Sequence, residues 1–258
     1  MERMEKNQFS IDYRVPYSDV TSGRKIRADK LVDCFQTIAI AHSDAVGYDL
    51  EFFDESGLGW IMTYWHVRIF EKPYEGDNIL LSTWCIPHKR VQAFRDFSME
   101  DEKGRELAHG SSKWAMMDTV KRRPARIKRE FYDAYAFEEE NPMMDIDFDT
   151  PQPEGEPESS VVFPVTRRDT DTNDHTNNIA YITWAMDEVV DDIYDRGEVT
   201  DIWVEYKKEC RRGTRVRSFN YSREYESEAG KVKIQTDSVF RDAESGKMLA
   251  HVCVEWKA

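Results

Sequence analysis

A stretch of this chain is repeated further along, and the repeat limits the folds that the chain can adopt. The stretch covers residues 102–114 and aligns without a gap with residues 244–256, with six identical positions. Each copy has a charged segment, a glycine in a short turn and a returning segment that ends on tryptophan, which predicts a β-hairpin. A gap-free match of this kind indicates an internal duplication. We therefore expect two lobes of similar architecture.

Each lobe has one amphipathic helix in front of its predicted strands. In the second lobe, apolar residues recur every three or four positions from Ile179 to Ile193, on a predicted helix that ends at Gly197. The first lobe has the same spacing from Leu31 to Ala45. Each helix therefore presents one apolar stripe that must be covered.

After each helix come alternating runs rich in β-branched and aromatic residues, which are typical of strands. The predicted strands are residues 60–70, 79–87, 92–100 and 107–118 in the first lobe and residues 201–208, 215–226, 231–242 and 248–257 in the second. One helix followed by a meander of four or five antiparallel strands predicts an α+β layer in which the sheet wraps the helix. The fold class expected for the chain is a tandem (double) hot dog fold.

An acidic segment separates the two lobes. Residues 133–158 contain ten Asp or Glu residues, no Lys or Arg, and four of the nine prolines. Charge repulsion and proline both oppose a packed element. We predict an N-terminal lobe at residues 1–137, an acidic, proline-rich linker at residues 138–160 and a C-terminal lobe at residues 161–258.

Composition excludes several classes of protein. The chain has 258 residues, of which 40% are hydrophobic and 33% are charged, so it is globular rather than disordered. Its net charge of -14 argues against nucleic acid or an anionic membrane surface as the main partner. No apolar run is long enough to span a bilayer and no export signal is visible. The four cysteines lie far apart, which predicts reduced thiols and a cytoplasmic location.

The most informative polar segment, residues 167–178, lies directly before the second helix. If this segment is extended, Asp171, Asn173 and His175 project from the same side. A carboxylate, an amide and an imidazole would then converge beside a helix amino terminus, whose free N–H groups suit a developing oxyanion.

This segment has two other interpretations. Its start resembles a calcium loop, but Asp174 stands where that loop needs glycine, and Ala180 stands where it needs glutamate. Its Asp, Thr and Asn residues are also ordinary turn and helix-cap residues. We expect no metal site and no cofactor.

A longer set of residues resembles a known family. The set comprises Asp171-x-Asn173-x-His175-x-Asn177-Asn178, then Tyr181-x-x-Trp184 and Glu188, then Val204 to Cys210, and Ser112 to Met117 in the first lobe. It resembles the acyl-acyl carrier protein thioesterases of the plant FatA/FatB type and their bacterial relatives. The resemblance implies a double hot dog fold and hydrolysis of acyl-acyl carrier protein to free fatty acid in fatty acid biosynthesis.

The resemblance also implies a catalytic set of four residues, Asp171, Asn173, His175 and Glu209. His175 or Glu209 can act as general base, and Asn173 can hold the water or the carbonyl. Asp171 can orient its neighbours or attack as a carboxylate nucleophile through an anhydride. The sequence leaves the choice between water attack and the anhydride open.

Cys210 offers a competing interpretation, since a cysteine with His and Asn elsewhere also describes nucleophilic catalysis. On a regular strand, Glu209 and Cys210 point to opposite faces. Cys210 shares its face with Val204 and Tyr206, so we expect it to be buried and prefer Glu209.

Three other histidines are predicted to be structural. His109 and His251 occupy equivalent positions of the repeated hairpin, and His42 lies on the first helix. The first lobe has no Asp, Asn and His trio before its helix, so we expect the second lobe to be catalytic and the first lobe to hold the acyl chain.

The expected partners are acyl carrier protein and a fatty acyl chain, and a homodimer is left open. Because acyl carrier proteins are acidic, docking needs a concentrated positive face. Basic runs occur at residues 121–129 and 207–217, and the second adjoins Glu209. The predicted docking residues are Lys207, Lys208, Arg211 and Arg212.

Three other functions remain as alternatives. They are an acyl-CoA thioesterase on the same fold, a non-catalytic acyl-binding module and, more weakly, a hot dog hydratase. The hydratase pattern needs histidine at position 176, where this chain has threonine.

Overall fold

The computed structural model of the chain describes residues 2–5, 7–137, 148–227 and 229–257. These residues form two compact units. Unit 1 comprises residues 1–63 and 67–146, and unit 2 comprises residues 64–66 and 147–258. Part of the predicted acidic linker, residues 138–147, lies outside the described residues.

Unit 1 contains one long helix, two short helices and a sheet in the order β1-β2-β4-β5-β6-β3, with β7 paired to β6. Its elements are β1 (Glu2–Glu5), β2 (Gln8–Arg14), the 3-10 turn η1 (Tyr17–Asp19), α1 (Ala28–Ala45), α2 (Leu50–Ser56), β3 (Leu58–Ile69), β4 (Asn78–Lys89), β5 (Gln92–Asp101), β6 (Glu106–Asp118), β7 (Arg123–Pro124) and α3 (Arg129–Ala134).

Unit 2 has a sheet in the order β9-β12-β11-β10-β8. Its elements are β8 (Ser159–Pro164), the 3-10 turn η2 (Arg167–Asp169), α4 (Asn178–Asp187), α5 (Asp191–Arg196), β9 (Glu198–Tyr206), β10 (Arg215–Glu226), β11 (Val232–Asp242) and β12 (Met248–Lys257).

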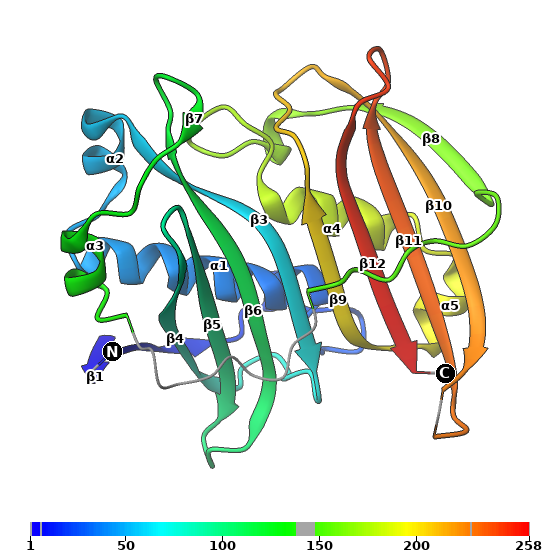
Figure 1. Cartoon of the computed structure of the whole chain (residues 1–258). Helices are drawn as coiled ribbons and strands as arrows, with labels where there is room; N and C mark the ends of the chain where they lie inside the picture. The colour runs from blue at the N-terminus through cyan, green and yellow to red at the C-terminus, as the bar shows by residue number, and fades with distance from the viewer. Residues whose placement is uncertain (1, 6, 138–147, 228, 258) are drawn as a thin grey trace. The chain divides into compact units, whose positions relative to one another are not determined.

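Both units wrap an antiparallel sheet around a helix, α1 in unit 1 and α4 in unit 2 (Figure 1). The apolar stripe of α1 accounts for this packing, because Leu31, Phe35 and Ile38 are all fully buried. The chain is therefore an α+β protein with two hot dog units in tandem, which confirms the predicted fold class.

The predicted meander is wrong in its connections. The first strand after each helix does not pair with the next strand in sequence: β3 neighbours β6, and β9 pairs with β12. In each unit, a strand that was not predicted precedes the helix and pairs with the second strand after it. In unit 1 β2 pairs with β4, and in unit 2 β8 pairs with β10. Sequential strands are neighbours only about two-thirds of the time, and short runs such as residues 159–164 carry little periodicity.

The predicted second helix is also interrupted. Helix α4 ends at Asp187 and α5 begins at Asp191. Acidic residues crowd this position, and two adjacent β-branched residues, Val189 and Val190, follow Glu188. Like charges on neighbouring turns and β-branched side chains both disfavour a continuous helix, whereas acidic residues favour a new helix start at Asp191.

The described end of the predicted linker lies against unit 2. Residues 148–158 contain no helix or strand, and they cross the face of the sheet opposite α4 (Figure 1). Glu154 forms an ion pair with Arg223 of β10, and Gln152 contacts Gln235 of β11. Thr150 is buried. This part of the linker is therefore held by specific polar contacts with the sheet.

The two repeated hairpins have matching turns. Gly104 and Gly246 both have a left-handed backbone, with φ of 76° and 70°. In each turn an aspartate side chain accepts two backbone N–H groups: Asp101 Oδ1 accepts those of Lys103 and Arg105, and Asp242 Oδ1, one position earlier in the repeat, accepts those of Glu244 and Ser245. The sequence repeat therefore corresponds to a repeat in structure.

Candidate active site

The backbone before α1 and the backbone before α4 follow the same path. Residues 17–27 and residues 167–177 each contain a 3-10 turn, a tight turn closed by an isolated β-bridge, and a helix start. Each loop has one left-handed residue at the same place, Arg24 in unit 1 and Asp174 in unit 2. The offset between the loops is 150 residues.

The side chains of the two loops differ in chemistry. The second loop carries Asp171, Asn173 and His175 at the positions that hold Thr21, Gly23 and Lys25 in the first. Only the unit 2 loop therefore offers an acid, an amide and an imidazole together.

The extended conformation expected for this segment is wrong. Asp171 Oδ1 accepts the backbone N–H groups of Asn173 at 2.9 Å and His175 at 3.1 Å, and the Asp171 N–H donates to the His175 carbonyl at 2.8 Å. An aspartate that bonds the backbone two residues ahead forms an Asx turn, which competes with extended structure. One oxygen of the Asp171 carboxylate is thus committed to shaping the loop.

The turn brings His175 to two charged side chains from the segment after β9. His175 Nε2 lies 3.6 Å from Glu209 Oε2 and 3.0 Å from Arg211 Nη2. The His175 side chain is 26% exposed and that of Glu209 is 45% exposed, so a substrate can reach both side chains from the solvent. An imidazole beside a carboxylate can accept and release a proton. No sequence pattern predicts the contact of Arg211 with His175, because this contact depends on how the two loops meet.

Asn173 is exposed, and among the described residues its amide has no hydrogen-bond partner. Its polar atoms are free to bind a ligand.

The start of α4 offers fewer free N–H groups for an oxyanion than the sequence predicts. Asn177 caps α4 by accepting the Ile179 N–H through its side chain and the Ala180 N–H through its carbonyl. Within the described chain, the N–H of Asn178 is the group at this end that has no such partner.

Cys210 is buried below the candidate site. Its Sγ lies 3.0 Å from Thr176 Oγ1 and 3.2 Å from the Tyr181 hydroxyl. Burial raises the pKa of the Tyr181 hydroxyl far above its usual value, so that group keeps its proton. The strand β9 ends at Tyr206, earlier than predicted, but Glu209 and Cys210 still point to different environments.

Three further residues of the family resemblance support the loop or the sheet. Trp184 Nε1 donates to Asp169 Oδ1 at 3.3 Å, which ties α4 to the 3-10 turn before the site. Tyr206 donates its hydroxyl to the Asn178 carbonyl at 3.0 Å. Glu188 accepts a hydrogen bond from Asn220 of β10. Trp184 and Tyr206 thus hold the start of α4 in place next to the acid, amide and imidazole.

The other histidines that the sequence singles out lie in packed positions. His42 is fully buried and its ring stacks on Phe9. His109 contacts Glu106, and His251 is buried with its Nε2 2.7 Å from Asp237 Oδ1. None of them contacts the His175 loop within the described residues.

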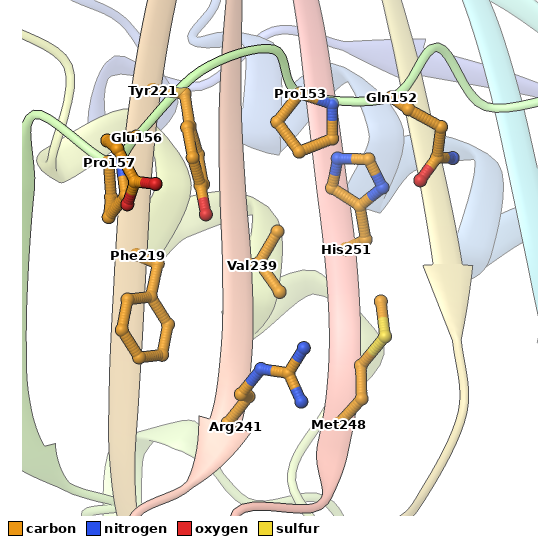
Figure 2. Close-up of a pocket in the computed structure, with 10 residues that line it drawn as sticks. All are labelled: Gln152, Pro153, Glu156, Pro157, Phe219, Tyr221, Val239, Arg241, Met248 and His251. Atoms are coloured by element: carbon orange, nitrogen blue, oxygen red, sulfur yellow. The ribbon is translucent and has the colours of Figure 1, made fainter.

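A pocket of about 440 Å³ lies elsewhere in unit 2, between residues 152–157 and the outer face of strands β10, β11 and β12. Figure 2 shows Phe219, Val239 and Met248 on its floor, with His251 and Gln152 near the crossing segment. None of the four candidate catalytic residues lines it. The candidate site is therefore an open surface loop rather than this pocket.

The predicted docking residues have different surroundings. Lys207 forms an ion pair with Glu205, and Arg211 reaches His175. Lys208 and Arg212 are exposed. The structure thus places one of the four, Arg211, in the candidate site itself.

In the described part of the chain, no three His, Cys, Asp or Glu side chains are grouped as metal ligands would be. Among the described helices, none is both long enough and apolar enough to cross a bilayer.

Comparison with known families covers most of the chain. Residues 6–135 match the acyl-ACP thioesterase N-terminal domain, and residues 154–258 match the acyl-ACP thioesterase C-terminal domain. A curated relative, oleoyl-acyl carrier protein thioesterase 1 of Arabidopsis thaliana, is 27% identical over 212 residues, which are 74% of this chain and 58% of the relative. The chain thus spans less than two thirds of the length of that relative.

Two solved structures share the fold. The 12:0-ACP thioesterase of Umbellularia californica matches with a TM-score of 0.84 at 23% identity, over 97% of this chain and 94% of that one. An acyl-ACP thioesterase of Bacteroides thetaiotaomicron matches with a TM-score of 0.79 at 18% identity, over 98% of this chain and 100% of that one. At these identities the likeness supports the fold.

Proposed function

The chain belongs to the acyl-ACP thioesterase family, and we propose that it hydrolyses acyl-acyl carrier protein to free fatty acid and carrier protein. The observation that carries this proposal is the contact of His175 with Glu209, 3.6 Å apart: His175 lies on the loop that unit 1 repeats with a lysine in its place, and Glu209 lies in the segment after β9. The relatives named above, from plants and a bacterium, carry the same activity in their names.

We propose that water attacks the thioester directly. His175 takes a proton from the water while Glu209 stabilises the imidazolium that forms. The new C–O bond produces a tetrahedral intermediate, whose collapse breaks the C–S bond, and His175 returns the proton to the departing sulfur. Asn173, with a free amide, positions the water or the carbonyl oxygen.

The geometry of Asp171 favours this route over an anhydride. A carboxylate that accepts two backbone N–H groups is held in place and is a weaker nucleophile than a free one. Asp171 then acts as a positioning residue, because it fixes the turn that presents Asn173 and His175.

Unit 1 is proposed to bind the acyl chain. It contains an aromatic cluster in which Tyr48 stacks on Phe131 and on Tyr135, with Trp60 and Phe52 against the edge of Phe131. Apolar and aromatic side chains are the usual lining of a site for a fatty chain. Lys207, Lys208, Arg211 and Arg212 are proposed to attract the acidic carrier to unit 2.

A reducing compartment such as the cytoplasm is the proposed location. The four cysteines, Cys34, Cys85, Cys210 and Cys253, are all free and buried. Free thiols persist where disulfides are kept reduced.

Release of free fatty acid from acyl carrier protein, compared with release from the same acyl-CoA, tests the substrate. We expect carrier protein to be preferred. Single variants then test the site: Asn173→Ala, His175→Ala and Glu209→Gln should each lower kcat by about 100-fold or more. These side chains are partly or largely exposed, so the thermal midpoint should change little.

Cys210→Ala is the matched control for Glu209→Gln. Its side chain is next in sequence but buried, so turnover should persist while stability falls. Preference for acyl-CoA would support the acyl-CoA thioesterase instead. Near-normal turnover in His175→Ala, or a covalent acyl group trapped on Cys210, would overturn the assigned site.

A further inference from the structure

Arg211 and His175 face each other because the backbone places them there. The two residues form an isolated antiparallel β-bridge, and their side chains meet with Nη2 3.0 Å from Nε2. The equivalent bridge of unit 1 joins Lys25 to Tyr74, and there too the side chains meet, with Lys25 Nζ 5.9 Å from the centre of the Tyr74 ring. The contact between Arg211 and His175 therefore follows from the backbone conformation that the two units share.

The chemistry of arginine determines the state of His175 in this contact. A guanidinium has only donors and is always protonated in proteins. His175 Nε2 must then accept the hydrogen bond through its lone pair, so the imidazole is neutral and its proton lies on Nδ1. In this tautomer neither nitrogen is free to take a proton from water.

Glu209 competes with Arg211 for the same nitrogen. Its Oε2 lies 3.6 Å from Nε2, and a carboxylate can only accept, so a hydrogen bond to Glu209 needs the proton on Nε2. That tautomer leaves the Nδ1 lone pair free to act as a base. The charged groups that contact the ring are Glu209 and Arg211 from the segment after β9, while Asp171 of its own loop accepts the backbone N–H of His175.

We propose that Arg211 is a latch that holds His175 in the tautomer unable to act as a base, and that a phosphate ester on the incoming thioester carrier releases it. The inference rests on the proposed function and adds to it a positioning residue and a trigger. Arginine binds phosphate through two parallel N–H groups, which an imidazole nitrogen cannot match. When Arg211 turns to a phosphate, Nε2 is freed and His175 pairs with Glu209.

Nitrogen-15 NMR of the imidazoles tests the latch without any turnover, because it distinguishes an Nδ1 proton from an Nε2 proton. Wild-type protein should show His175 with its proton on Nδ1. Arg211→Met should move the proton to Nε2, and so should phosphopantetheine added to wild type, whereas pantetheine, which lacks the phosphate, should not. Arg215→Met removes an exposed arginine at the first position of β10 and should leave the tautomer unchanged.

Turnover of two small substrates tests the trigger. Wild type should hydrolyse acyl-phosphopantetheine with a kcat/KM about tenfold above that of acyl-pantetheine. In Arg211→Met the two values should become equal, mainly because acyl-pantetheine improves, and Arg211→Lys should restore part of the difference. Acyl-CoA and acyl carrier protein, run in parallel, separate the two natural sources of the phosphate.

The two proposals fail in different ways. The latch is overturned if wild type and Arg211→Met show the same His175 tautomer, or if the preference for phosphate survives the substitution. If instead the tautomer moves as expected but no substrate is hydrolysed, the latch stands and the proposed thioesterase activity is wrong.

Discussion

Asp171 is the residue whose surroundings most directly distinguish the two routes of hydrolysis. Its Oδ1 holds two backbone N–H groups, and an asparagine side chain can accept the same two bonds. We therefore expect Asp171→Asn to retain kcat within about tenfold of wild type and to keep its thermal midpoint. An amide cannot form an anhydride, so the measurement of kcat in this variant separates the two mechanisms.

Asp171→Ala is the companion variant. It leaves both N–H groups without their acceptor, so the turn should loosen and kcat should fall by about 100-fold. If Asp171→Asn is as inactive as Asp171→Ala while its fold is intact, Asp171 is a nucleophile and the direct attack of water is wrong.

The sequence proposes candidate catalytic residues, but it does not determine their geometry. The alternation rule placed Asp171, Asn173 and His175 on one side of an extended segment, whereas the Asx turn of Asp171 folds the segment back. The contact between Arg211 and His175 spans 36 positions and depends on that turn. Local propensity contains no information about which loops meet.

At the scale of the element, periodicity was a good guide where segments are long. The runs predicted at residues 215–226 and 248–257 match β10 and β12 at both ends. It failed for the short strands β2 and β8 and for the order of strands in the sheets, because hydrophobic period fixes which face of a strand is buried but not which strand lies beside it.

Helix α1 carries a pH-sensitive contact with its sheet. His42 is buried on α1, and its Nδ1 lies 3.0 Å from a nitrogen of Arg95 on β5. Burial and the Arg95 charge lower the pKa of His42 from 6.5 to about 3. The unfolded chain therefore binds the proton more readily between these values, so stability is lost as pH falls below about 6.5.

We expect the titration of His42 to lower the free energy of unfolding by about 1.4 kcal/mol when the pH falls from 7.5 to 5.5. Urea unfolding at the two pH values measures the change. His42→Gln keeps an acceptor for Arg95 but cannot titrate, so its loss should be smaller by that amount. An equal loss in the variant and in wild type would show that His42 does not titrate as its burial implies.

At the scale of the whole molecule, duplication has left one loop geometry with two sets of side chains. Gly23 and Lys25 stand where unit 2 has Asn173 and His175. Both units therefore share the loop conformation, but only unit 2 carries the proposed catalytic side chains. The net charge of -14 adds a second requirement. The proposed acidic carrier needs a local positive surface on a molecule whose net charge repels it at long range.

Lys208 and Arg212 test that surface better than Arg211, which touches His175. Lys208→Glu combined with Arg212→Glu should raise KM for acyl carrier protein by about five- to tenfold at low salt, relative to KM for acyl-pantetheine, and the effect should shrink as salt screens the charges. Lys128→Glu combined with Arg129→Glu changes the net charge equally but lies in unit 1, where both side chains already pair with acids. This control should raise KM much less. Equal effects from both pairs would mean that only net charge matters and that the proposed docking surface is wrong.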